Sequence, residues 1–162
     1  MDDFFTDQTS GKLASLTSEQ IRSIQGQLKQ PDKKLDLYVT LYTRQLNPAI
    51  REYLSLIDVV TLWTWETAEL ANLESNLAKL EKLAPKCRKL LGCYTADYDP
   101  KRTPSWTALP SPLMQRQCET GLKWLRQGRI DGIIIYGTAM DLGWGSVEWA
   151  REWIRRVGDE KL

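Results

Sequence analysis

The stretch Asp58-Val59-Val60-Thr61-Leu62-Trp63-Thr64-Trp65-Glu66 decides the fold, because it has the pattern of a short buried strand that leads into a helix. Alternate residues of a strand point to opposite faces of the sheet. One set, Val60 and Leu62, is aliphatic and suits packing beneath helices. The other set, Thr61, Trp63 and Trp65, is larger or more polar and suits the inside of a barrel. The stretch therefore predicts a strand with one aliphatic face and one aromatic face.

Three further stretches carry the same alternation, at 36–43, 88–95 and 131–138. Apolar residues at helical spacing follow each of the four strands, and a capping box at Thr17-Ser18-Glu19-Gln20 begins another helix. Met1 to Phe5 is interpreted as the end of one more strand. Strict alternation of strands and helices predicts an α/β fold with parallel strands joined by right-handed crossovers.

Capping residues indicate where the helices begin and end. Asn47-Pro48 is expected to begin one helix, with a side-chain cap and a proline at the first position. Ser111-Pro112 begins another, and Ser146 is expected to cap the last helix, which closes at Gly158. The longest loop runs from Ala96 to Pro110, and loops of this length are often functional.

Two architectures with parallel strands compete. A doubly wound sheet normally begins with a glycine-rich first turn, and the sequence contains none. A TIM-type barrel has polar or aromatic inward residues near the carboxyl ends of its strands and functional loops beyond them. The second description fits the strand pattern better, so we expect half of a (β/α)8 barrel.

Composition excludes several classes of function. The 162 residues suit a single domain, residues 1–162. A net charge of +1 gives no electrostatic case for nucleic acid, and no apolar run reaches the roughly 18 residues of a membrane span. The absence of histidine removes the Ser-His-Asp and Cys-His nucleophile systems and the usual His-containing metal sites. Three widely spaced cysteines indicate a reducing, cytoplasmic location, and we expect neither a metal ion nor a cofactor.

Four motifs together indicate a known kind of protein: Met1-Asp2-Asp3-Phe4-Phe5, Thr61-Leu62-Trp63-Thr64-Trp65, Leu91-Gly92-Cys93-Tyr94 and Asp141-Leu142-Gly143. They resemble the second half of bacterial TIM-barrel proteins that are similar to glycoside hydrolases. The resemblance covers nearly the whole chain, from the end of strand four through helix eight. It implies a carbohydrate-active protein, and it implies that strands one to three and most of strand four have no counterpart here.

Glycoside hydrolysis needs two carboxyl groups across the scissile bond. Asp2 and Asp3 stand where a barrel strand would deliver such groups, and Glu66 is the third predicted catalytic residue. Each has a structural alternative. Asp2 and Asp3 can be solvated residues at a chain terminus, and Glu66 can be a first-turn glutamate that faces the helix dipole. Asp97 and Asp99, in the long loop, can instead form turns.

The predicted substrate-binding residues are mostly aromatic. They are Tyr42, Trp63, Trp65, Tyr94, Asp97, Tyr98 and Tyr136. Five of the aromatic residues, all but Tyr98, would ring one mouth of the barrel. Stacking on sugar rings is the functional interpretation, and filling of the core is the alternative.

Four strands and a stub cannot close a barrel, which needs about eight strands. The open sheet would expose more apolar surface than soluble monomers usually tolerate. We therefore expect a homodimer, or a partner chain that supplies the missing N-terminal half-barrel. Three hypotheses of function remain: a carbohydrate-active enzyme, a non-catalytic half-barrel that assembles with itself or a partner, and a sugar-binding module without turnover.

Overall fold

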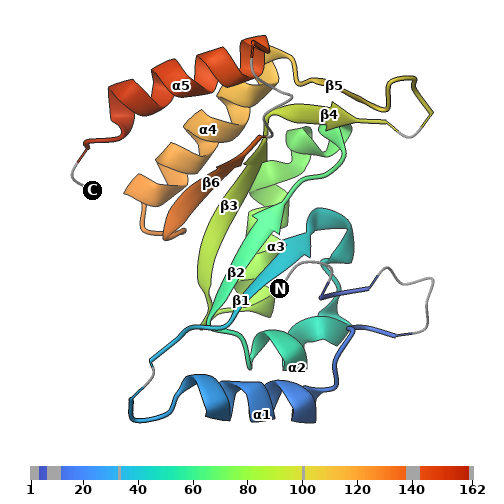
Figure 1. The fold of residues 1–162 in the computed structure, drawn as a ribbon, viewed down its shortest axis with the longest axis vertical. Coiled ribbons are helices and arrows are strands. Elements are labelled where there is room, and N and C mark those ends of the chain that lie inside the picture. The colour runs from blue at the N-terminus through green and yellow to red at the C-terminus, as the bar shows by residue number, and fades with distance from the viewer. Residues whose placement is uncertain (1–3, 7–11, 33, 100, 138–142, 161–162) are drawn as a thin grey trace. The chain divides into compact units, whose positions relative to one another are not determined.

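A computed structural model describes residues 4–6, 12–32, 34–99, 101–137 and 143–160, and Figure 1 shows how they fold. Strands and helices alternate along most of the chain. In chain order the elements are α1 (Ser18–Leu28), β1 (Tyr38–Tyr42), η2 (Thr43–Gln45), η3 (Pro48–Ile50), α2 (Arg51–Leu54), β2 (Val59–Trp63), η4 (Thr67–Asn72), α3 (Leu73–Leu83), β3 (Arg88–Tyr94), β4 (Ala96–Tyr98), β5 (Trp106–Ala108), α4 (Ser111–Arg126), β6 (Gly132–Tyr136) and α5 (Gly145–Val157).

The main sheet has four parallel strands in the order β1-β2-β3-β6. All four lie inside the stretches in which the sequence predicts strands, so the α/β class and the parallel arrangement are confirmed. Neighbouring strands of the sheet are also successive main-sheet strands along the chain. The described strands therefore contain no reversal of order, and such a reversal is the mark of a doubly wound sheet.

The chain divides into two compact units. The first comprises Met1–Leu62 and Glu74–Leu90, and the second comprises Trp63–Leu73 and Leu91–Leu162. Strands β2 and β3 therefore begin in the first unit and end in the second. The prediction of a single domain over residues 1–162 stays a prediction.

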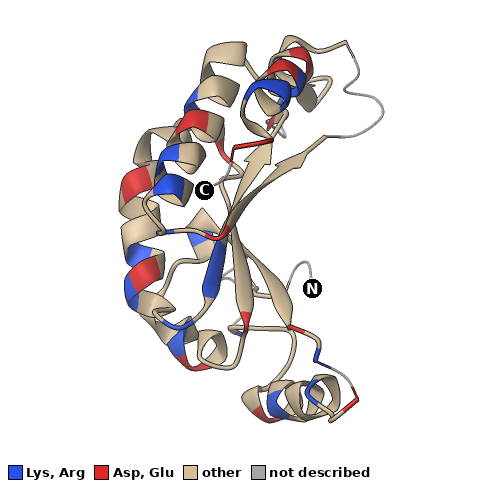
Figure 2. Cartoon of the chain, turned by 90° about the vertical axis from the view of Figure 1, so that its left-hand side faces the viewer, with Lys and Arg blue, Asp and Glu red and all other residues tan. Residues whose placement is uncertain are grey.

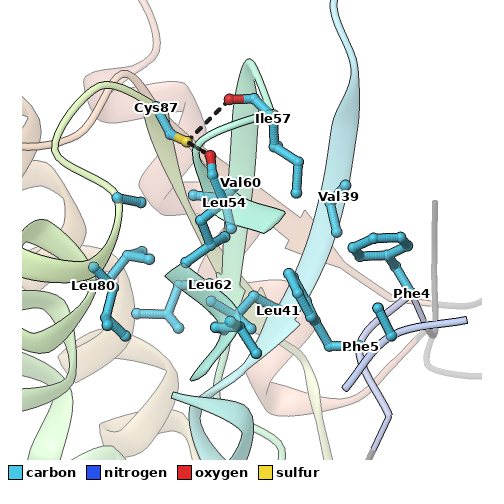
Figure 3. Close-up of a cluster of buried hydrophobic side chains, with 14 of the residues drawn as sticks. Phe4, Phe5, Val39, Leu41, Leu54, Ile57, Val60, Leu62, Leu80 and Cys87 are labelled. Carbon is cyan, nitrogen blue, oxygen red and sulfur yellow. Dashed lines mark hydrogen bonds between the residues drawn. The ribbon is translucent and has the colours of Figure 1, made fainter. Parts of the chain in front are cut away.

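The first unit has an aliphatic core, drawn in Figure 3. Val39 and Leu41 of β1 and Leu62 of β2 are each no more than 2% exposed, as the alternation of the strand sequences predicts. Leu54 of α2 joins them and is fully buried. The buried Cys87 thiol donates a hydrogen bond to the Leu54 carbonyl oxygen at 3.0 Å, and burial raises the pKa of this thiol. The aliphatic faces of the strands thus form the interior of this unit.

The segment before α1, in which the end of a further strand is predicted, is described only in part. Residues 1–3 lie outside the described part of the chain, and Phe5 forms a single antiparallel bridge with Ala14. The side-chain amide of Gln45 donates to the Phe5 carbonyl oxygen at 2.7 Å. Phe4 and Phe5 are both buried in the core of the first unit. Since only two of the five residues are described, the end of a strand over residues 1–5 stays a prediction.

The helix signals are confirmed at some positions and wrong at others. The capping box of α1 is present: the Gln20 N–H donates to Thr17 Oγ1 at 3.2 Å, and the Thr17 N–H donates to Gln20 Oε1 at 2.8 Å. Asn47 caps as predicted, since its Oδ1 accepts from the Ala49 N–H at 3.0 Å. The helix that follows it is short, because it consists of the 3-10 turn η3 and the four residues of α2.

In the second unit, α4 packs against β6 and α5. Met114 and Trp124, both on α4, are fully buried. Gly121 lets this helix approach closely, because a Cβ atom there would lie 2.9 Å from the side chains of Leu91 and Ile133. The helix-facing side chains of β3 and β6 thus meet a helix that has a glycine at the point of contact.

Ser146 does not cap α5, contrary to the prediction. The helix begins at Gly145 and its N-cap residue is Trp144. The fully buried Ser146 hydroxyl donates instead to the Thr95 carbonyl oxygen at 2.7 Å. Thr95 in turn donates from its N–H at 3.0 Å and from its hydroxyl at 3.1 Å to the Tyr136 carbonyl oxygen. The serine therefore ties the start of α5 to the ends of β3 and β6.

The segment Ala96 to Pro110, expected to be a loop, contains a hairpin. Strands β4 and β5 pair antiparallel, with Ala96 opposite Ala108 and Tyr98 opposite Trp106. Three residues per strand are too few to produce a recognisable alternation in the sequence. The hairpin follows β3 directly, so it holds its two aromatic residues near the carboxyl end of that strand.

Candidate functional site

Aromatic rings gather at the carboxyl ends of three main-sheet strands. Trp63 is the last residue of β2, Tyr94 of β3 and Tyr136 of β6. The ring centroids lie 4.6 Å apart for Trp63 and Tyr94, 5.7 Å for Tyr94 and Tyr136, and 6.2 Å for Trp63 and Tyr136. The contact between Trp63 and Tyr94 confirms that these two side chains lie on the same side of the sheet, as the alternation predicts.

Trp65 and the hairpin add further rings to this group. The Trp65 centroid lies 5.5 Å from that of Tyr94, 5.1 Å from that of Tyr98 and 5.3 Å from that of Trp106. Tyr98 and Trp106 lie 4.6 Å apart. Trp65 thus joins the strand ends to the hairpin in one set of touching rings. We call this set the aromatic cluster: Trp63, Trp65, Tyr94, Tyr98, Trp106 and Tyr136.

The aromatic cluster has a buried base and an exposed rim. Trp63 is 8% exposed, whereas Trp106 is 41% and Tyr136 51% exposed. Trp65, Tyr94 and Tyr98 are half-buried. Large aromatic side chains that are exposed at the rim of a buried aromatic group are typical of a binding surface.

Gly92 makes the base of the cluster possible. A Cβ atom at this position would lie 2.1 Å from Cδ2 of Trp63, far inside the normal separation of two carbon atoms. The Trp63 indole therefore lies directly against the backbone of β3 at Gly92. Only glycine leaves room for the ring in this position.

Polar side chains anchor the hairpin beside the rings. The Thr67 hydroxyl donates to Oδ1 of Asp97, and the Arg102 guanidinium forms an ion pair with Oδ2 of Asp97 at 3.0 Å. Arg102 also donates to the Asp97 carbonyl oxygen at 3.0 Å and lies 3.8 Å from the Asp99 carboxylate. The Asp99 carboxylate accepts from the Lys101 N–H at 2.9 Å. Both oxygens of the Asp97 carboxylate are thus engaged in holding the hairpin to η4 and to Arg102.

Two buried polar atoms in this part of the chain stand out. The Thr64 hydroxyl and the Nε of Arg102 make no hydrogen bond within the described residues. Thr64 is 4% exposed and sits in the sequence between the cluster residues Trp63 and Trp65. The Arg102 Nε nonetheless lies 3.8 Å from the Asp99 carboxylate, which is its ionic partner within the hairpin.

The other predicted site residues are Asp2, Asp3, Glu66 and Tyr42. Asp2 and Asp3 lie outside the described residues. Glu66 is exposed and precedes the 3-10 helix η4, and its carbonyl oxygen accepts from the Glu69 N–H at 2.9 Å. Tyr42 belongs to the first unit, where it is 6% exposed and the Arg44 guanidinium lies 4.6 Å from its ring centroid.

Several residues of the site are not among those that sequence reasoning selected. Trp106 lies in the segment expected to be a loop, and Thr67 and Arg102 carry no signal in the sequence, because their contacts depend on the hairpin. Gly92 had a recognisable signal. It is a small residue on the face of β3 that otherwise carries large side chains.

The described residues contain no group of three or more acidic or cysteine side chains arranged to hold a metal ion. Among the helices that the structure describes, none combines the length and the apolar character needed to cross a bilayer. No protein-family model matches this chain, and no curated protein matches it either.

Proposed function

We propose that the aromatic cluster binds a carbohydrate and that this binding, without turnover, is the function of the chain. The observation that carries the proposal is the contact between rings from three strand ends and the hairpin, with Trp106 and Tyr136 exposed at the rim. The C–H faces of sugar rings pack against aromatic faces through dispersion and burial of apolar surface. Binding sites of this kind combine aromatic walls with a few placed polar groups.

The polar groups next to the cluster support a ligand that carries hydroxyl groups. The Asp97 and Asp99 carboxylates and the Arg102 guanidinium belong to the same hairpin as Tyr98 and Trp106. Tyr98 and Tyr136 add phenolic hydroxyls. A neutral sugar presents apolar ring faces and hydroxyl edges together, which is the combination that this surface offers.

We further infer that the main sheet is half of a (βα)8 barrel, from the end of strand four through helix eight. The order β1-β2-β3-β6 without reversal supports this, because barrel strands follow one another in chain order. The position of the aromatic cluster supports it as well. Binding sites of such barrels lie at the carboxyl ends of the strands, and Trp63, Tyr94 and Tyr136 end theirs.

Hydrolysis of a glycosidic bond would need more than the cluster provides. One carboxyl group must be protonated to act as an acid and a second must act as base or nucleophile. Asp97 is engaged by Arg102 and Thr67, which favours its role as an anchor of the hairpin over a role as acid. Asp2, Asp3 and Glu66 remain the proposed catalytic residues if the chain has glycosidase activity.

The proposal is tested by titrating the chain with neutral oligosaccharides, such as cellohexaose, maltohexaose and xylohexaose, in a calorimeter. We expect at least one of them to bind. Trp106→Ala should weaken this binding by about tenfold, since one exposed ring contributes on the order of 1.4 kcal/mol. Trp149→Ala is the matched control, because Trp149 stacks on Trp153 in α5 and is not part of the cluster.

Equal loss of affinity in both variants, or no binding to any oligosaccharide, would count against a sugar surface at the cluster. Release of reducing sugar from the same oligosaccharides by the unaltered chain would show turnover. In that case Asp2→Asn, Asp3→Asn and Glu66→Gln should each be assayed, and a loss of about a hundredfold is expected for a general acid or base.

A further inference from the structure

Strand β6 is an outer strand of the main sheet and has one neighbour, β3, among the described strands. The other edge of an outer strand presents backbone N–H and C=O groups to which a further strand can pair. Proteins usually protect such an edge with charged residues, proline or a bulge. The sequence of β6, Gly-Ile-Ile-Ile-Tyr, contains none of these residues. Figure 2 shows that charged residues gather on the helices instead.

Both faces of β6 carry uncovered apolar side chains next to this edge. On the face of the aromatic cluster, Ile134 is 39% and Tyr136 51% exposed. On the opposite face, Ile135 lines a groove of about 200 Å³ together with Ala150 and Ile154 of α5. Ile154 is itself 47% exposed. The edge of β6 is thus flanked on both faces by apolar surface that a neighbouring strand would cover.

We propose that β6 pairs antiparallel with β6 of a second copy of this chain, about a two-fold axis that passes next to Ile134. In this register Ile134 faces Ile134 of the copy, Ile133 faces Ile135, and Gly132 faces Tyr136. Residues that face each other across an antiparallel pair lie on the same face of the sheet. The exposed Ile134 and Tyr136 of both copies therefore lie on one face, and Ile133 of the copy lies opposite Ile135 on the other.

A second copy is favoured over an unrelated strand because the sequence of β6 is complementary to itself. Paired about Ile134, it places no like charges opposite each other and sets the tyrosine ring opposite a glycine, which leaves room for the ring. An isologous contact of this kind closes after two copies. The proposal is independent of sugar binding, although it places Tyr136 of the aromatic cluster at the contact between the copies.

The test begins with the mass of the unaltered chain at tens of micromolar, measured by light scattering. We expect twice the 18.7 kDa of one chain. Ile134→Lys places two ammonium groups opposite each other at the axis, and Ile134→Glu places two carboxylates there. Each variant should weaken dimerisation by roughly a hundredfold or more, because like charges would be buried face to face. Gln115→Lys, on an exposed position of α4, is the control and should stay dimeric.

The two charged variants together distinguish this pairing from others. If residue 134 faces its own copy, an equimolar mixture of Ile134→Lys and Ile134→Glu should form a mixed dimer, since opposite charges then meet. Pairing of β6 with a different strand of the copy, such as β1 in a closed eight-stranded barrel, predicts no such rescue. Unfolding of each variant by urea checks that the monomer is intact. A monomeric unaltered chain, a dimer that tolerates both charges, or failure of the mixture to dimerise would each overturn the proposal.

Discussion

Replacing Gly92 by alanine is expected to displace the ring of Trp63. The new Cβ atom would lie 2.1 Å from Cδ2, 2.2 Å from Cε3 and 2.4 Å from Cε2 of the indole. Non-bonded carbon atoms normally stay about 3.5 Å apart or more, so the ring must move by about 1.4 Å. Because the indole is 8% exposed and lies 4.6 Å from the Tyr94 ring, it cannot move without displacing its neighbours.

Two effects of this substitution oppose each other. Alanine in place of glycine within a strand stabilises the fold by about 0.5–1 kcal/mol when there is room for the methyl group. Overpacking of a filled interior destabilises by about 1–3 kcal/mol. The overpacking is expected to win here, because the close contacts involve ring-fusion atoms of a buried indole and not the end of a flexible side chain. For a chain of this size, each kcal/mol lowers the thermal midpoint by about 2–4 °C.

Urea unfolding followed by tryptophan fluorescence measures the change. Gly26→Ala is the matched control, since Gly26 lies within α1 and a Cβ atom there meets nothing within 4 Å. Alanine at this position should stabilise the chain by about 0.5–1 kcal/mol. Glycine to alanine should therefore lower the free energy of unfolding at position 92 and raise it at position 26.

A double-mutant cycle tests the cause. Trp63→Leu removes the ring that alanine at position 92 would strike, so the two substitutions together should cost less than the sum of their separate effects, by more than about 0.5 kcal/mol. Additive effects, or a Gly92→Ala variant as stable as the unaltered chain, would refute the view that Gly92 is required by the Trp63 ring.

Three further predictions concern the hairpin, pH and the thiols. Arg102→Ala removes the ion pair with Asp97, so amide hydrogen exchange in residues 96–108 should quicken by roughly tenfold while the rest of the second unit is unchanged. A hydrogen bond from Lys29 lowers the pKa of Asp36 below its ordinary value of 3.8, so this contact stabilises the fold above that value and is lost as the pH falls through the lowered pKa. The free energy of unfolding, measured with urea, should fall less between about pH 5 and pH 2 in Asp36→Asn than in the unaltered chain. An equal fall in both would contradict this prediction. Burial and hydrogen bonding raise the thiol pKa of two of the cysteines, so a maleimide should label none in the folded chain and all three after unfolding: Cys87, Cys93 and Cys118.

The main sheet could be predicted because its signal is local. Each strand in 36–43 and 58–66 has an aliphatic face and an aromatic face, so residue type alternates along the sequence with a period of two. The same alternation predicts that Trp63 and Tyr94 lie on one face, and the contact of their rings confirms this. Strand order followed from the strict alternation with helices, since crossovers of this kind make neighbours of successive strands.

The hairpin and the contacts of the segment before α1 could not be predicted, because distant residues decide them. Strands β4 and β5 have three residues each, and their place depends on Trp65 and on the Asp97–Arg102 ion pair. The carbonyl oxygen of Phe5 accepts from the side-chain amide of Gln45, forty residues later in the chain, and no local pattern indicates this contact. Ser146 likewise has the chemistry of a cap, but its hydroxyl finds a buried carbonyl across the fold. A residue distant in the sequence overrides the local structural preference where it offers the same polar group a better hydrogen bond.

The packing of Trp65 against Trp106 also has an optical consequence. Their centroids lie 5.3 Å apart and their planes are inclined by 81°. Transition dipoles of two indoles at this separation couple, and the coupled pair produces two circular dichroism bands of opposite sign. These bands overlap the region in which helices absorb, so the spectrum of this chain will misstate its helix content. The same bands offer a direct optical report on whether the hairpin is seated against Trp65.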